Sequence, residues 1–240
     1  MRRPTQTEFT THKLNEDHKF ENPLRDIILG GQDGLVNALG IILGVSVATT
    51  DVRILIATVI AASIAESISM GAVAYTSALA QKDYYESERK KEKREIEEIP
   101  EMEKEEVRRI YEEKGLKGPL LEEVVNVIVS DKKVWLDTMM TEELHIQPVN
   151  TKAVLKSSVI VTVATAIGHL IPLIPFLFVV HQEGLLISLI ISSLSLFIVG
   201  VYQAVTLVGN WWKSGLRMVI IGIGAAAAGY VIATLFHSAS

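Results

Sequence analysis

Four glutamates form two pairs, one on each side of a proline. Glu92 and Glu95 come before Pro100, and Glu103 and Glu106 follow it. Residues three positions apart lie on the same face of a helix, so each pair can present two carboxylates to one ion. A reversal of the chain at the proline would bring the two pairs together. The spacing thus indicates a carboxylate site for a cation. The alternative is a solvent-exposed helix that is stabilised by ion pairs between Glu and Lys or Arg.

A second group of candidate ligands lies in the sequence WLDTMMTEELHI, where Met139, Met140 and Glu143 can share a face of one helix. Adjacent methionines are more often core residues, which is the alternative here. Two thioethers beside a carboxylate suit a borderline-soft divalent ion better than calcium or magnesium, which prefer oxygen ligands. The chain contains no cysteine, so any metal must be held by Glu, Asp, Met, His or backbone atoms.

A further carboxylate, Glu66, lies near the middle of the apolar stretch 54–81. A stretch of this length can cross a hydrocarbon core of about 30 Å at about 1.5 Å per residue. An ionisable residue at that depth costs at least ~2.5 kcal/mol on insertion scales, and such residues usually face a pathway or a protein interior. Glu66 is therefore the first candidate for a transport pathway.

Two other residues extend this candidate pathway. From the rise per residue, Asp33 lies roughly 9 Å and Met70 roughly 15 Å from the cytoplasmic ends of their spans, with Glu66 one turn deeper than Met70. This spacing predicts a ladder of ligands, and the alternative is that Asp33 is an interfacial residue and Met70 a packing residue. His169, in the third apolar stretch, is either a proton carrier or a hydrogen-bonded interior histidine, and we favour the interior histidine.

These residues must be positioned by an all-α membrane protein with one polar insert. The chain of 240 residues is 49% hydrophobic, yet residues 82–152 hold 19 of its 28 acidic and 14 of its 23 basic side chains. The rest contains five apolar runs, each long enough for one transmembrane helix. We predict spans at about 27–49, 54–81, 153–180, 184–208 and 216–236. The predicted domains are a cytoplasmic leader (1–26), spans 1 and 2 (27–81), a cytoplasmic metal-binding insert (82–152) and spans 3 to 5 (153–240).

The insert is predicted to be helical rather than disordered, because its apolar residues recur at helical spacing. Span 2 should continue as a helix to Pro100, since neither glycine nor proline occurs between residue 82 and that proline. Further helices are expected at about 101–114, 120–129 and 131–144, the last of them capped by Ser130.

The distribution of Lys and Arg predicts the orientation of the chain. The leader, the insert and the loop NWWKSGLR are rich in these residues, whereas the loops on the opposite side and the tail hold only Arg53. By the positive-inside rule, the N-terminus and the insert are cytoplasmic and the C-terminus lies on the other side.

Four stretches occur in an order that matches one known family. They are DGLVNALGIILGV in span 1, SISMGAVAY in span 2, the glutamate-rich insert around Pro100, and WLDTMMTEELHI before span 3. Together they resemble the vacuolar iron transporter family, the ferrous iron and manganese proton antiporters of yeast and plants, over about residues 24–237. The resemblance implies a homodimer of five-span protomers, with a cytoplasmic domain that collects metal ions and a translocation path at the dimer interface.

The resemblance also implies roles for individual residues. Asp33 and Met70 would belong to the translocation pathway. The ligands of the cytoplasmic domain would be Glu92, Glu95, Glu103, Glu106, Met139, Met140 and Glu143. This chain departs from many relatives in span 2, where they carry a glutamate at the position of Ala62, two turns before the methionine. Glu66 lies only one turn before Met70, but both positions fall within about 40° of one helix face, so Glu66 can substitute.

We therefore expect a secondary transporter, not an enzyme, that exports Fe²⁺ and also Mn²⁺ or Zn²⁺ from the cytoplasm in exchange for protons. It would need no prosthetic group, and its partners would be the bilayer, a second copy, the metal ions and protons. The net charge of −5 argues against a nucleic-acid partner. The membrane would be the cell membrane of a prokaryote, or the vacuolar membrane as in eukaryotic relatives.

The alternative function is a membrane-anchored metal sensor or a ferritin-like iron protein without transport. A di-iron oxidase normally needs Glu-x-x-His pairs, and the insert contains only His145, which does not lie three residues after a glutamate. A sensor with a simple anchor would not require Asp33 and Glu66 in its spans. Both features favour the transporter.

Overall fold

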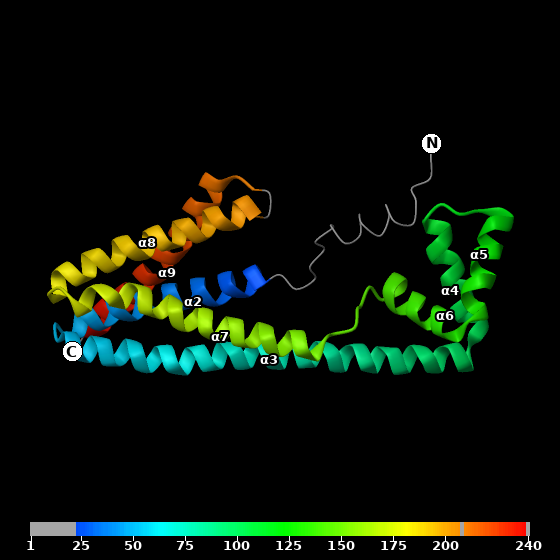
Figure 1. Cartoon of the computed structure of the whole chain (residues 1–240), viewed down its shortest axis with the longest axis horizontal. Coiled ribbons are helices and arrows are strands. Elements are labelled where there is room, and N and C mark those ends of the chain that lie inside the picture. Colours follow the sequence, from blue (N-terminus) through cyan, green and yellow to red (C-terminus); the bar gives the residue numbers. More distant parts are fainter. Residues whose placement is uncertain (1–22, 207–208, 239–240) are drawn as a thin grey trace, which may run out of the picture. The chain divides into compact units, whose positions relative to one another are not determined.

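The computed structural model describes residues 23–206 and 209–238, and within those ranges every regular element is a helix. Five helices are long and apolar enough to cross a membrane, which confirms the all-α membrane fold with five spans. They are α2 (Pro23–Ala48), α3 (Val52–Glu98), α7 (Thr151–Leu173), α8 (His181–Thr206) and α9 (Trp211–Ser238) (Figure 1). The predicted leader lies largely outside the described residues, and α2 begins at Pro23 rather than at residue 27.

The helix of the second span continues into the polar insert as predicted: α3 runs for 47 residues without a break. Residues 82–98 contain neither glycine nor proline, so nothing there interrupts the helical hydrogen bonds. The helix ends at Glu98 because a proline disfavours the helical conformation of the residue before it, and Ile99 has φ −132° and ψ 49°. Pro100 then opens α4 (Pro100–Glu113), where its missing N–H costs no hydrogen bond.

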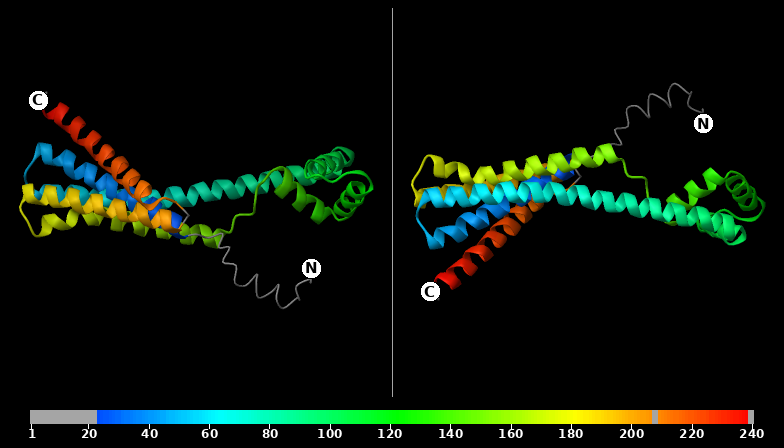
Figure 2. Two further views of the ribbon diagram at one scale, coloured as in Figure 1. Left: turned by 90° about the horizontal axis from the view of Figure 1, so that it is seen from above. Right: turned by 90° about the horizontal axis from the view of Figure 1, so that it is seen from below.

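The helices divide between two compact units, which are described separately. The first contains the described residues up to Ala72 together with those from Lys156 onward, and the second contains residues 73–155. In the first unit, α8 and α9 both pack against α2. Figure 2 shows α9 diverging from the other helices of this unit toward its C-terminus. The core between these helices is built from Leu35, Leu196 and Met218.

Glycines bring α2 and α7 into backbone contact. A Cβ atom added at Gly34 would overlap the carbonyl oxygen of Thr165, and one added at Gly168 would overlap that of Gly31. Small residues allow such close approach of membrane helices, and the contact replaces a layer of side chains. It fixes how far residues on α2 lie from residues on α7.

Prolines lie where the third span ends. Pro172 lies in the last turn of α7, and the chain continues as a 3₁₀-helix, η2 (Ile174–Leu177), that contains Pro175. Ser188 of α8 donates a hydrogen bond of 2.7 Å to the carbonyl of Pro172. A neighbouring helix thus satisfies one backbone group at the break, as the interior of a bilayer requires.

The second unit combines the C-terminal part of α3 with short helices. These are α4, α5 (Gly118–Ser130), α6 (Lys132–Thr138) and a π-helical turn, η1 (Met139–Glu143). The predicted cap at Ser130 is wrong, because Asp131 occupies the N-cap position and its carboxylate accepts hydrogen bonds from the backbone N–H groups of Lys133 and Val134. The Ser130 hydroxyl instead donates to the carbonyl of Val127, within the preceding helix.

Candidate functional site

The second unit buries two carboxyl groups, one from each side of the chain reversal at Pro100. Glu92 of α3 is 5% exposed and Glu103 of α4 is 3% exposed. Each keeps one carboxyl oxygen without a hydrogen-bond partner among the described residues. An ionised carboxyl is costly to bury unless its charge is paired, so this environment favours a cation beside the two groups.

Five glutamates interact in this cluster. Burial, followed by a hydrogen bond and repulsion from Glu103, raises the pKa of Glu92 from its ordinary 4.5 to about 9. Burial and repulsion from Glu103 and Glu95 raise the pKa of Glu106. Burial and repulsion from Glu106 and Glu103 also raise the pKa of Glu143. All three shifts have the sign expected of carboxyls that crowd together without enough positive charge.

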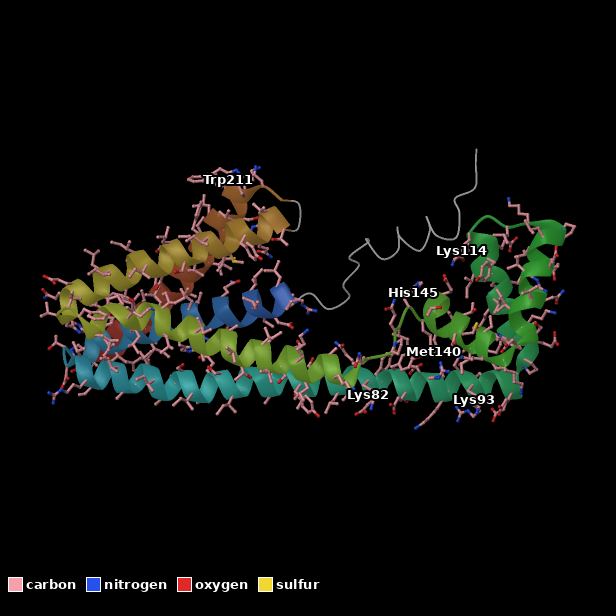
Figure 3. The ribbon with its side chains drawn as sticks, viewed as in Figure 1. Lys82, Lys93, Lys114, Met140, His145 and Trp211 are labelled. Carbon is pink, nitrogen blue, oxygen red and sulfur yellow. The ribbon has the colours of Figure 1, made fainter. Side chains whose placement is uncertain are left out.

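The π-helical turn η1 places both candidate methionines inside the unit. Met139 is 0% exposed and Met140 is 1% exposed. They share a hydrophobic core with Ile96 of α3 and Val107 of α4, each of which directly follows a glutamate of the cluster. Figure 3 shows Met140 where η1 lies over α3. Both thioethers are therefore buried, and they belong to the same core that the carboxyls border.

The cluster is not a preformed metal centre. Among the described residues, no three His, Asp or Glu side chains stand as joint ligands of one ion. Carboxylates repel one another when no cation lies between them, and the raised pKa values of Glu92, Glu106 and Glu143 favour protons on these three groups. A divalent cation would replace those protons and draw the oxygens together, so binding would release protons.

The first unit holds a second polar cluster, centred on Glu66 of α3. One carboxyl oxygen of Glu66 accepts a hydrogen bond from the side-chain amide of Asn37 on α2. The other oxygen lies 3.0 Å from Nε2 of His169 on α7. His169 is fully buried, so the favoured interpretation of a hydrogen-bonded interior histidine agrees with its surroundings.

The contacts of His169 require one proton between its ring and Glu66. Nδ1 of His169 lies 2.9 Å from the carbonyl oxygen of Thr165, and a carbonyl can only accept, so Nδ1 carries a hydrogen. Nε2 and the Glu66 oxygen are then both acceptors unless they share one further proton. The pair is therefore an imidazolium with a carboxylate, or an imidazole with a carboxylic acid.

Asp33 joins this cluster, which corrects the predicted ladder. The carboxyl of Asp33 is a direct neighbour of Glu66, with which it can share a hydrogen bond, and it lies within electrostatic range of His169. The two carboxyls are thus neighbours, whereas the rise per residue had predicted different depths for them. Met70 lies one turn along α3 from Glu66 and is partly buried.

Sequence reasoning did not assign a role to Asn37 or Thr165. Asn37 lies four residues after Asp33, and Thr165 lies four residues before His169, so each pair shares a helix face. That spacing was a usable signal, but only the packing of α2 and α7 shows that both faces meet Glu66. A cavity of about 250 Å³ between α3 and α7 borders His169 and Ser63 and is otherwise lined by apolar side chains.

Comparison with known proteins covers both units. A sequence profile described as the VIT family matches residues 24–234. A protein from Eucalyptus grandis named vacuolar iron transporter 1 is 33% identical over 216 residues, which cover 90% of this chain and 87% of that protein. A protein of the same name from Arabidopsis thaliana is 32% identical over 211 residues, covering 88% and 84%. A vacuolar iron transporter from Toxoplasma gondii is 29% identical over 236 residues, covering 94% and 78%.

Proposed function

Because the chain belongs to the VIT family, we propose that it is a multi-pass membrane transporter of iron and not an enzyme. Its relatives carry the name vacuolar iron transporter, and its five apolar helices suit that role. The finer proposal is that it exports Fe²⁺, and also Mn²⁺, from the cytoplasm in exchange for protons.

The proton-sharing contact between Glu66 and His169 carries this proposal. It lies in the apolar part of the first unit with the carboxyl of Asp33 beside it. Ionisable residues in membrane spans are expensive, and they mark ion pathways and proton relays. A cation that binds these carboxyls takes the place of a proton, so metal and protons occupy the site in turn.

The glutamate cluster supports a second role, the collection of ions on the cytoplasmic side. We assign the insert over 82–152 to this task, with the four paired glutamates, Met139, Met140 and Glu143 as ligands. The support is the raised pKa of Glu92, Glu106 and Glu143, because such groups release protons to a cation. The bias of Lys and Arg toward this side supports a cytoplasmic insert and N-terminus.

A homodimer is the proposed assembly. α3 exposes small residues at a spacing of four, namely Ala57, Ala61, Ala65 and Ser69. A stripe of small residues lets two membrane helices approach closely, which supports pairing of this face with a second copy. The pathway residue Glu66 directly follows Ala65, so the dimer contact and the pathway would be adjacent.

Flux measurements in proteoliposomes test the transport proposal. Asp33→Ala and Glu66→Ala should each abolish Fe²⁺ uptake driven by a pH gradient, because each removes a carboxyl that holds cation or proton. Glu183→Ala, an exposed change in the first turn of α8, is the control and should keep wild-type flux. Wild-type flux in Asp33→Ala would refute the pathway, and metal binding without flux in the unmodified protein would favour the sensor or ferritin-like alternative.

A further inference from the structure

His169 is buried in α7 with its ring directed at the acidic residues of two other helices. We propose that Nε2 of His169 is a protein ligand of the transported cation, completing a site with the carboxylates of Asp33 and Glu66. This inference rests on the proposed function, because it names a further ligand in the pathway of that transporter. It also gives the pathway a nitrogen donor.

The hydrogen bonds of the ring are those of a metal-binding histidine. Such a histidine usually donates its other ring N–H to a carbonyl or carboxylate, which fixes the tautomer and the ring orientation. Nδ1 of His169 has this partner in the Thr165 carbonyl at 2.9 Å. Thr165 is itself fully buried, and its hydroxyl donates to the carbonyl of Val161 at 2.9 Å. These contacts hold Nε2 toward Glu66, where it can act as the ligand atom.

The spacing of the donors suits a shared ion. Two ligand atoms at about 2.1 Å from a metal and at a right angle to each other are about 3 Å apart. Nε2 of His169 and the nearer oxygen of Glu66 are separated by 3.0 Å. The described residues do not already form a group of three ligands, and the two oxygens of Glu66 contact Asn37 and His169. An arriving cation would replace the proton between Glu66 and His169 and draw in Asp33.

A nitrogen ligand changes which ions can bind. Carboxylates alone suit Mg²⁺, Ca²⁺ and Mn²⁺, whereas imidazole suits iron, zinc and other transition metals. A site made of Asp33 and Glu66 alone would not reject Mg²⁺. His169 therefore contributes, together with Met70, to the selection of Fe²⁺ over Mg²⁺ where the ion meets the two carboxyls.

The competing interpretation is that His169 only positions Glu66 through a hydrogen bond. His169→Gln separates the two, because an amide can still hydrogen-bond to Glu66 but offers no ring nitrogen. His145→Gln is the matched control, since His145 lies at the end of η1 in the second unit and its ring nitrogen contacts the Thr141 carbonyl. Both variants are made in the full chain and reconstituted in lipid.

Pulsed electron paramagnetic resonance of the Mn²⁺-loaded protein is the test. A nitrogen coupling from a bound imidazole should appear in wild type and in His145→Gln, and it should be lost in His169→Gln. Labelling the wild-type protein with ¹⁵N-histidine should change the nitrogen hyperfine coupling if a histidine binds the ion. This measurement needs no variant, so it does not depend on whether His169→Gln folds. In flux assays, His169→Gln should be inhibited by Mg²⁺ at roughly tenfold lower concentration than wild type, a change of the size typical for metal-site partners.

Two results would overturn the assignment. One is a nitrogen coupling that persists in His169→Gln, and the other is a wild-type spectrum without any histidine nitrogen. If either result is found while the wild-type protein still transports Fe²⁺, only the assignment of His169 as a ligand fails. If wild type carries no Fe²⁺ at all, the proposed transport function fails first.

Discussion

Replacing Glu92 by the neutral residue glutamine should stabilise the ion-free second unit against unfolding at neutral pH. Its pKa rises from 4.5 to about 9 on folding, so ionisation opposes folding. The cost is absent below pH 4.5 and grows as pH rises toward about 9. Neutral pH lies about 2.5 pH units above the ordinary pKa, and each unit corresponds to about 1.4 kcal/mol. Glu92→Gln should therefore raise the unfolding free energy by about 3 to 4 kcal/mol at most at pH 7.

Urea unfolding followed through Trp135 measures this effect. Trp135 is buried in the core of the second unit, so its fluorescence reports that unit once Trp211 and Trp212 are replaced by Phe. The gain in Glu92→Gln should vanish near pH 4, and saturating Mn²⁺ should reverse it because the neutral amide is a poorer ligand. Glu122→Gln is the control, since Arg108 lowers the pKa of Glu122 and the change should not stabilise. Equal stability of wild type and Glu92→Gln at pH 7, or an unchanged gain at pH 4, would refute the reasoning.

Three further outcomes are expected. Replacing Glu103 and Glu106 together by Ala should remove most of the divalent-ion binding that calorimetry detects in the second unit, and undiminished binding would count against the glutamate cluster as the site. The affinity of the wild-type protein for the ion should rise from pH 6 to pH 9, because the glutamates with raised pKa values lose their protons over this range. Met70→Ala should slow Fe²⁺ flux and blur selectivity without abolishing transport, whereas a complete loss would mean that Met70 is essential. A cysteine at Ser238 should label from outside intact cells and one at Ser87 should not; the reverse pattern would invert the orientation and turn the exporter into an importer.

The fold was largely predictable because it depends on apolar length and on prolines. Five apolar runs became five helices, and the run after residue 82 stayed helical up to the proline, as expected. Helix starts were less predictable. The cap at Asp131 instead of Ser130 depends on which of two adjacent side chains reaches the backbone N–H groups, and composition does not decide this.

The sequence was enough to propose residues for the candidate pathway, but it did not predict their arrangement. The cost of a buried charge singled out Glu66 without any structure. The meeting of Glu66 with Asn37 and His169 depends on the close approach of α2 and α7 and on the rotation of three helices about their axes. A one-residue rotation turns a helix by about 100°, so depth estimates alone could not place these side chains together.

The glycine contact between α2 and α7 limits where an ion can leave the site. Gly34 meets the Thr165 backbone and Gly168 meets that of Gly31, so the two helices are in direct backbone contact along this seam. Backbones in such contact leave no gap for a hydrated ion and tend to move as one rigid body. An exit route for an ion from the proposed site would therefore lie away from this seam, and a cavity of about 250 Å³ between α3 and α7 adjoins His169.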